Sequence, residues 1–445
     1  MAIPKTDEGL KRVIGLSGIA LTIVNYTIGA SIFILPAFIS IQLGAFGIFA
    51  YVFCGIMLGA IMLCYVEIGS KITTTGGTYA YVVAAFGEFP GFVINWLLFF
   101  GWAMLSGAAL MNIVADSLAI LFPAFLLPWS RALLYFILLS VMVVLNVRSA
   151  EQGVSFIKWS AIINLLPLAG IIIFGFAYIK SSNLHWEHLP TITSFGNTSL
   201  ILFFAFAGFE SALSASGEIS NPKRTIPRGI LLGGGILLIV YLLIQLVAQG
   251  VLGTQMETFK DAPLAAVAEK IVGPVGGTII LLAAAYSCLT SVSCDLFTTP
   301  RILFAGAHDG IFPKILGKVH PKFATPYIAI SLYAILIFIF SIAGGFQQLA
   351  ILASASILLI YLAVILATIK LRLKKQDSTE KTFRMPGGLI IPFIGIASII
   401  WLLTSLGKWE ILSTIIFIAI VSVIYLVMKK LKVRRGHLIS DEIIL

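Results

Sequence analysis

Charged side chains are scarce in this sequence of 445 residues. Asp, Glu, Lys and Arg make up 11% of the chain, whereas hydrophobic residues make up 59% and the mean hydropathy is +1.06. A soluble globular protein cannot bury so much apolar surface, so we expect a lipid bilayer as the solvent. The apolar runs show no strand-like alternation, which excludes a membrane barrel. The composition therefore predicts an all-α membrane protein.

Cysteine and histidine are also few, and their placement argues against metal binding and against catalysis within the membrane. Cys54, Cys64, Cys288 and Cys294 lie inside apolar runs without metal-ligand spacing, and they are interpreted as small core residues. All five histidines fall in predicted loops or tails. No nucleophile with a base and no set of metal ligands lies at membrane depth, so we expect neither an intramembrane enzyme nor a metal or cofactor site.

Long apolar runs between turn signals predict about twelve spanning helices. The predicted spans are 13–41, 43–70, 89–122, 131–148, 154–179, 197–217, 228–252, 275–300, 326–344, 347–371, 389–406 and 409–431. The first run has no cleavage site and is interpreted as a span, not as a signal peptide. A short interfacial helix is expected near residues 262–272, in the longest external connection.

The basic residues report the orientation of the chain. With twelve crossings, 24 of the 29 Lys and Arg residues fall on the side of the N-terminus, and five fall on the other side. Because cytoplasmic loops carry excess positive charge, both termini are expected in the cytoplasm of a multi-pass cell-membrane protein. The net charge of +10 then indicates contact with anionic membrane lipid, and no nucleic acid partner is expected.

Two of the spans carry small residues at mid-depth. The first contains Gly29 within residues 27–33, and the sixth contains Gly208 within residues 204–211. These spans are five apart and start on opposite sides of the membrane, as inverted repeats of five helices require. Broken helices there would expose N–H groups for a carboxylate and carbonyls for an ammonium, which suits an amino acid. The alternative is ordinary packing glycines.

Several motifs recur in the order of a known family. They are Gly29-Ala30-Ser31-Ile32-Phe33, Tyr65-Val66-Glu67-Ile68-Gly69, Gly208-Phe209-Glu210-Ser211, Glu218-Ile219-Ser220-Asn221-Pro222 and Phe383-Arg384-Met385-Pro386-Gly387. Nearly the whole chain resembles the amino acid, polyamine and organocation permeases, which share the LeuT-type fold. The resemblance implies repeats at 13–179 and 197–371, two further helices at 389–431, and cytoplasmic ends at 1–12 and 432–445.

The same resemblance implies a substrate site between helices 1 and 6, lined also by helices 3, 8 and 10. Carried over by position, its residues are Thr27, Gly29, Ala30, Ser31, Gly101, Trp102, Ser106, Phe204, Ala205, Ala207, Gly208 and Ser354. Phe204 matches an aromatic gate of the related arginine/agmatine antiporters. Glu210 matches an acidic residue that acts in proton sensing or gating there.

Two positions depart from the family pattern. Asn164 stands where many relatives carry a lysine that replaces a sodium ion, so a sodium site that includes Ser291 is an alternative to proton coupling. Asp295 replaces a bulky apolar residue of the pocket, and a carboxylate at membrane depth needs a partner. Asp295 either binds a cationic substrate or titrates as a coupling group. The alternatives are that hydroxyls such as Ser291 and Thr298 satisfy it, or that it is displaced towards the cytoplasmic vestibule.

These features predict a secondary transporter of amino acids that works by alternating access, and Asp295 favours substrates with a cationic side chain. A polyamine transporter of the same fold and a channel are the alternatives. Proton symport, sodium symport and exchange stay open, as do the monomer and the homodimer. Glu67 and Lys71, four residues apart, are interpreted as a solvated pair at a helix end.

Overall fold

The computed structural model describes residues 14–29, 31–72, 77–148, 153–186, 189–213, 219–308, 312–323, 325–374 and 383–442. Helices form nearly all regular structure in these ranges, and the one β-type pairing is an isolated bridge between Ile14 and Ile219. This is the all-helical architecture that the composition predicts. The predicted cytoplasmic N-terminus, residues 1–12, lies outside the described residues, and so does Ala30 of the predicted site.

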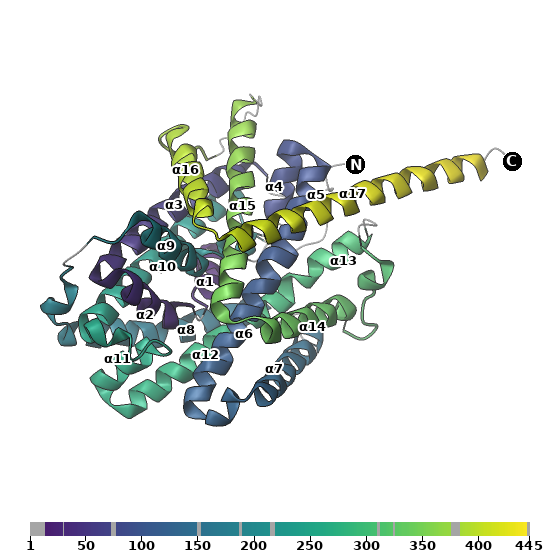
Figure 1. Cartoon of the computed structure of the whole chain (residues 1–445). Coiled ribbons are helices and arrows are strands. Elements are labelled where there is room, and N and C mark those ends of the chain that lie inside the picture. The colour runs from purple at the N-terminus through teal and green to yellow at the C-terminus, as the bar shows by residue number, and fades with distance from the viewer. Residues whose placement is uncertain are drawn as a thin grey trace.

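The helices follow one another as a bundle, from which α17 projects (Figure 1). The first half holds α1 (Leu16–Thr27), α2 (Ser31–Leu43), α3 (Gly47–Lys71), α4 (Gly77–Phe86), α5 (Glu88–Trp96), η2 (Leu97–Ala103), α6 (Met104–Leu121), α7 (Pro128–Arg148) and α8 (Gly153–Gly175). The second half holds α9 (Ile192–Phe206), η6 (Phe209–Leu213), α10 (Pro222–Leu252), α11 (Pro263–Val272), α12 (Pro274–Thr298), α13 (Pro300–His308), α14 (Tyr327–Ala343), α15 (Phe346–Leu373), α16 (Ile390–Thr404) and α17 (Lys408–Glu442).

Every predicted span coincides with a helix or a broken helix, and the short helix expected near 262–272 is α11. The sixth span starts five residues earlier than predicted, because the Thr191 hydroxyl caps α9 by accepting from the Ser194 N–H at 3.1 Å. The sequence did not predict α4 and α13. Among the described residues, nine helical stretches are long and apolar enough to cross a bilayer.

On α7 polar side chains are buried and large apolar side chains are exposed, the reverse of a helix at the surface of a soluble protein. Ser130 and Asn146 are buried, whereas Leu133 and Phe136 are exposed. Burying polar groups while exposing large apolar ones is favourable only where the surroundings are themselves apolar. The outward side chains of α7 therefore face lipid, and the chain is a multi-pass membrane protein.

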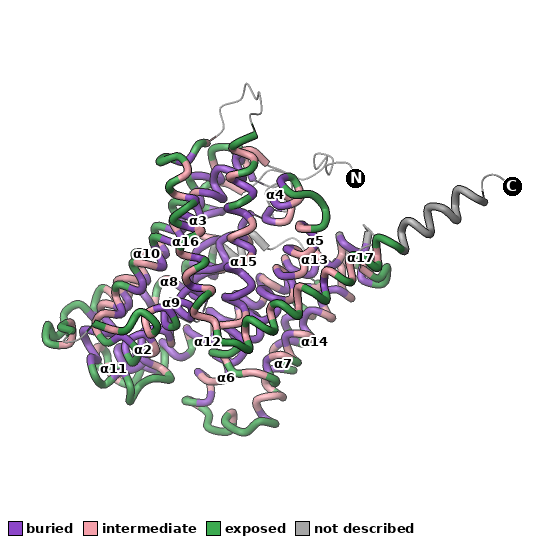
Figure 2. Tube along the Cα trace, turned by 45° about the horizontal axis from the view of Figure 1, so that its top comes forward, coloured by how far each residue is buried: buried purple, intermediate pink, exposed green. Residues whose placement is uncertain are grey.

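Close helix packing places the site in the middle of the bundle. α1 packs along α10, α6 packs along α12, and α15 contacts both α3 and α6. A Cβ atom on Gly233 of α10 would lie 3.1 Å from the Ala20 carbonyl oxygen, so only glycine allows α1 to come this near. Figure 2 shows buried segments gathered in the centre of the bundle and exposed ones along its edge, including α17.

The interpretation of Glu67 as solvated is wrong. Its carboxylate is fully buried, lies 2.9 Å from Lys71 Nζ and 3.6 Å from Arg372 Nη1, and accepts the Met385 N–H at 3.1 Å. The i+4 spacing in the sequence indicated only Lys71, one of the three partners of the Glu67 carboxylate. The other two come from α15 and the segment before α16, which only the folded chain brings to the end of α3.

Candidate functional site

The two predicted helix breaks are present, and they lie side by side. α1 ends at Thr27 and α2 begins at Ser31, while α9 ends at Phe206 and η6 begins at Phe209. Between the latter two, Gly208 has a φ of +116°, a conformation that side chains other than glycine rarely adopt. A Cβ atom there would lie 3.4 Å from the Tyr26 carbonyl oxygen, so the break in the sixth span touches the break in the first.

Tyr241 of α10 joins the two breaks from behind. Its hydroxyl lies 2.8 Å from the Thr27 carbonyl oxygen and 2.9 Å from the Ala205 carbonyl oxygen. Both carbonyls belong to helix ends whose last C=O groups have no partner within their own helix. The hydroxyl carries one proton, so it donates to one carbonyl at a time and links both ends through a single group.

A small cavity lies where the breaks meet. It has about 30 Å³ of free space, room for one or two water molecules. Its lining comes from both breaks and from α6 and α12, and the residues are Tyr26, Thr27, Gly29, Ser31, Trp102, Ser106, Leu110, Phe204, Ala207, Gly208, Ser211, Ser291 and Asp295. Its free volume is too small for an amino acid, so a substrate enters only when side chains or helices move.

Most of the predicted substrate residues line this cavity, and some do not. Thr27, Gly29, Ser31, Trp102, Ser106, Phe204, Ala207, Gly208 and Asp295 line it, as does Ser291 of the predicted coupling group. Gly101 instead faces the Ser356 side chain of α15. Ala205 contributes its carbonyl to Tyr241, away from the cavity. Ser354 is buried in α15, and its hydroxyl has no hydrogen-bond partner in the described part of the chain.

Sequence reasoning missed four residues of the site. Tyr26, Leu110 and Ser211 line the cavity, and Tyr241 supports it. Leu110 follows Ser106 by four residues on α6, so helical periodicity could have found it. Tyr241 carries no such signal, because it lies in an apolar helix far from either break in the sequence.

The third predicted span, which consists of α5, η2 and α6, reaches the cavity through an irregular turn. Residues Leu97–Ala103 form a π-helical turn, η2, between α5 and α6. Such turns insert one residue and rotate the following side chains, and they are frequent at functional sites. Trp102 lies in this turn and lines the cavity, whereas its neighbour Gly101 faces α15.

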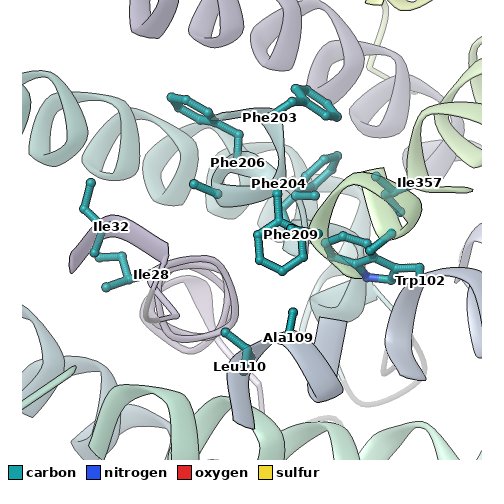
Figure 3. Packing of buried hydrophobic residues seen from close by; sticks show 14 of the residues in the cluster. Ile28, Ile32, Trp102, Ala109, Leu110, Phe203, Phe204, Phe206, Phe209 and Ile357 are labelled. Carbon is teal, nitrogen blue, oxygen red and sulfur yellow. The ribbon is translucent and has the colours of Figure 1, made fainter. Parts of the chain in front are cut away.

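Aromatic rings cover one side of the cavity. The ring centroid of Phe204 is 5.7 Å from that of Trp102 and 5.8 Å from that of Phe346, in tilted and edge-on arrangements. Figure 3 shows Phe204, Phe209 and Trp102 close together, with Leu110 of α6 across from them. Phe204, which the family resemblance implies as an aromatic gate, thus lines the cavity beside Trp102.

Asp295 is the one charged residue of the lining. It is half-buried, and its carboxylate makes no hydrogen bond or ion pair within the described residues. The two hydroxyls expected to satisfy it are engaged elsewhere: Ser291 donates to the Asn25 carbonyl at 3.3 Å, and Thr298 donates to the Cys294 carbonyl at 3.1 Å. The alternative in which these two hydroxyls satisfy the Asp295 carboxylate is therefore wrong.

Glu210 differs from Asp295 because it has donors. Its Oε2 atom accepts from the Tyr361 hydroxyl at 2.5 Å and from the Gly208 N–H at 3.2 Å. The second oxygen, Oε1, is buried without a partner in the ranges that the structure describes. Glu210 thereby connects η6 to α15 by a hydrogen bond, two residues after Gly208.

Asn164 lies in a neutral polar cluster next to the first break. Its amide nitrogen donates to Asn25 Oδ1 at 3.1 Å and contacts Thr290 Oγ1 at 3.3 Å, while Asn164 Oδ1 is buried without a partner in the described part of the chain. With Ser291, these residues offer neutral oxygen atoms of the kind that hold Na⁺. Within the described residues, no group of three His, Cys, Asp or Glu side chains could hold a metal ion.

Comparison with known proteins places this geometry in a family. Residues 14–430 match the family described as amino acid permease. Similar proteins of Bacillus subtilis (strain 168) include the branched-chain amino acid permease BcaP, 26% identical over 96% of this chain and 94% of the relative. The methylthioribose transporter is 28% identical over 94% of each chain. The serine/threonine exchanger SteT is 27% identical over 90% of this chain and 92% of the relative.

The family match at residues 14–430 covers both broken helices and the helices around the cavity, and the three relatives match at least 90% of this chain. These relatives are transporters, and their names give different substrates. The match and the paired helix breaks agree, and the chain belongs to the amino acid permease family.

Proposed function

We propose that this protein is a secondary transporter that moves amino acids across the cell membrane by alternating access. The observation that carries the proposal is the cavity between the two broken helices, lined by Thr27, Gly29, Ser31, Ala207 and Gly208. A binding site where two broken helices meet inside a membrane bundle suits a carrier, which binds its substrate and then releases it on the other side. A channel would need a continuous pore instead.

The helix ends supply complementary groups for an amino acid. The first N–H groups of α2, starting at Ser31, have no intrahelical acceptor and carry partial positive charge, which suits the carboxylate. The last carbonyls of α9, ending at Phe206, suit the ammonium group. Thr27 adds a buried hydroxyl that has no partner in the described part of the chain. The head group would thus be held mainly by backbone.

Asp295 supports a cationic side chain on the substrate. Its carboxylate lines the cavity without a protein partner in the described ranges, and no Lys or Arg lines the cavity with it. An unpaired carboxylate at membrane depth is costly until a cation neutralises it, and a cationic substrate does this on binding. Arginine and lysine are therefore the substrates that we propose first, ahead of neutral amino acids.

Two layers close the site from opposite ends. Phe204, with Trp102 and Phe346, covers one end, and the contact between Glu210 and Tyr361 closes the other. Under the proposed topology of twelve crossings and cytoplasmic termini, the first layer faces outward and the second faces inward. Alternating access would open one layer while the other stays closed, as the first and sixth spans rock together against a more fixed scaffold of the other helices.

Two coupling schemes use different polar groups. Asn164, Thr290 and Ser291 hold only neutral groups, so this cluster would serve Na⁺. Glu210 and Asp295 are ionisable and would serve a proton.

If Na⁺ drives uptake, an imposed sodium gradient stimulates it and Asn164→Lys abolishes that stimulation. If protons drive uptake, an imposed pH gradient stimulates it and either Glu210→Gln or Asp295→Asn abolishes that stimulation. Exchange requires neither gradient, only preloaded amino acid.

The test of the function is uptake by purified protein in proteoliposomes. Labelled lysine, leucine, methylthioribose and putrescine should be offered separately, and then in competition with one another. We expect saturable uptake of lysine, with leucine as the weaker substrate. Inhibition by putrescine alone would favour the polyamine alternative, and flux that rises linearly with concentration would favour the channel. Light scattering of the same preparation in detergent distinguishes the monomer from the homodimer.

A further inference from the structure

A second and larger cavity lies beyond the aromatic layer. It has about 520 Å³ of free space, and nine of its 14 lining residues are polar. Its walls come from α2, the start of α9, the start of α15 and the junction between α16 and α17. The size is that of a small-molecule site, and the walls carry amides and hydroxyls, for example on Gln42, Asn197 and Gln347, which suit a polar solute better than lipid tails.

The outer and inner cavities adjoin neighbouring turns of α9. Ile201 lines the outer cavity, and Phe204, one helical turn further along α9, lines the inner cavity. Phe346, whose ring lies 5.8 Å from that of Phe204, directly precedes Gln347 of the outer wall. The two cavities therefore adjoin neighbouring turns of α9, and Phe204 lies on the inner side.

Glu410 gives the outer cavity its charge. It is the one charged residue of the lining, and no Lys or Arg lines the cavity with it. It is half-buried in the first turn of α17, and its carboxylate makes no hydrogen bond or ion pair with the described residues. Each chamber thus contains a single carboxylate, Glu410 outside and Asp295 inside, without a counter-charge in its walls.

We propose that the outer cavity is a docking site for amino acids of net positive charge, where Glu410 holds the substrate cation before Phe204 moves aside. A carboxylate in a recessed, polar chamber concentrates cations near the entrance and selects them before the closed inner site opens. A neutral amino acid gains little, because its own carboxylate opposes the attraction of its ammonium group. The proposal rests on the proposed transport of cationic amino acids.

The first test compares two neutralised carboxylates on the same side of the protein. Glu410→Gln should raise the KM for external lysine about two- to five-fold, as expected for a partly exposed ion pair, and leave the KM for leucine and the maximal rate unchanged. Glu257→Gln is the matched control, because Glu257 is exposed and lies outside the cavity. The Glu410 effect should shrink at high ionic strength.

The second test does not depend on transport. All four native cysteines are buried, so a cysteine introduced at the exposed Asn197 gives a specific label. Glu410→Gln should slow the reaction of Asn197→Cys with a cationic methanethiosulfonate reagent and leave the reaction with a neutral reagent unchanged. Thr258→Cys, exposed and outside the cavity, is the control whose labelling should not respond.

The outcomes separate the two proposals. If the unmodified protein takes up no lysine, the proposed cationic function fails, and the docking of cationic amino acids falls with it. If the protein takes up lysine and Glu410→Gln behaves like Glu257→Gln, the docking site alone is overturned. Equal labelling of Asn197→Cys with and without Glu410 would also overturn it, since the carboxylate would then exert no field in the cavity.

Discussion

Asp295 and Glu210 each place a carboxylate inside the bundle, but only Glu210 has hydrogen-bond donors. The Tyr361 hydroxyl and the Gly208 N–H both donate to one oxygen of Glu210. Asp295 faces the cavity and has no such donor within the described residues. Glu210 thus has donors from the protein, and Asp295 has none within the described residues.

Replacing Asp295 by Asn should therefore affect substrates unequally. The carboxylate would make a charge-assisted contact with a cationic side chain, and such contacts contribute about 1.5–3 kcal/mol. We expect the KM for lysine to rise about 10- to 100-fold and the KM for leucine to change less than about three-fold, measured by uptake into proteoliposomes. An equal loss for both substrates would show that Asp295 does not select them.

Tyr241 offers a second test at the residue scale. Tyr241→Phe removes the hydroxyl that lies against the Thr27 and Ala205 carbonyls, and an unsatisfied buried carbonyl costs about 1–3 kcal/mol. We expect transport to fall about ten-fold, with a lower thermal midpoint in detergent.

Tyr51→Phe is the control for Tyr241→Phe. Tyr51 is equally buried, but its hydroxyl has no hydrogen-bond partner in the described part of the chain. Its removal leaves no carbonyl bare, so transport and thermal midpoint should stay near those of the parent protein. A similar loss in both variants would mean that the hydroxyl of Tyr241 has no special role at the breaks.

At the scale of elements, the fold depends on helices that stop in mid-membrane. Backbone groups in a bilayer must be paired, so a break persists only where protein groups satisfy it. Here the neighbouring chain does so: Tyr241 serves carbonyls of both breaks, Ser291 donates to the Asn25 carbonyl, and Glu210 accepts the Gly208 N–H. The breaks are thus properties of several helices together.

Gly208→Ala tests the break in the sixth span. With φ at +116°, a residue other than glycine is strained by about 1–3 kcal/mol, and its Cβ would crowd the Tyr26 carbonyl. We expect uptake to fall at least about ten-fold at equal amounts of protein in the membrane.

The control for Gly208→Ala is Gly235→Ala on the exposed side of α10, where an added Cβ meets nothing within 4 Å. Alanine favours an ordinary helix over glycine, so this variant should be neutral or slightly more stable. Undiminished uptake by Gly208→Ala would show that the site does not need the left-handed backbone at this position.

At the scale of the whole molecule, orientation can be tested by labelling. The proposed topology places Ser181, in the connection before α9, outside, and Lys314, in the connection before α14, inside. Both side chains are exposed, and the native cysteines are buried. A membrane-impermeant thiol reagent added to intact cells should label Ser181→Cys at once, and Lys314→Cys only after permeabilisation. The reverse pattern would invert the proposed orientation.

The sequence by itself determined the class of the molecule and much of its site. Apolar runs located the helices, because a bilayer requires about 20 apolar residues per span. Gly29 and Gly208 marked the breaks, since glycine at mid-span is a local property that can be read without knowing its neighbours. The family resemblance then placed most of the residues that line the cavity.

Only the tertiary structure decided which polar groups are partnered. Glu67 was interpreted as solvated, although Arg372 and Met385 reach it from far along the chain. The hydroxyls of Ser291 and Thr298 lie within one helical turn of Asp295, yet they donate to backbone carbonyls and leave the carboxylate free to face the cavity. Hydrogen bonding depends on atoms meeting within about 3 Å, and the packing of separate helices sets that distance.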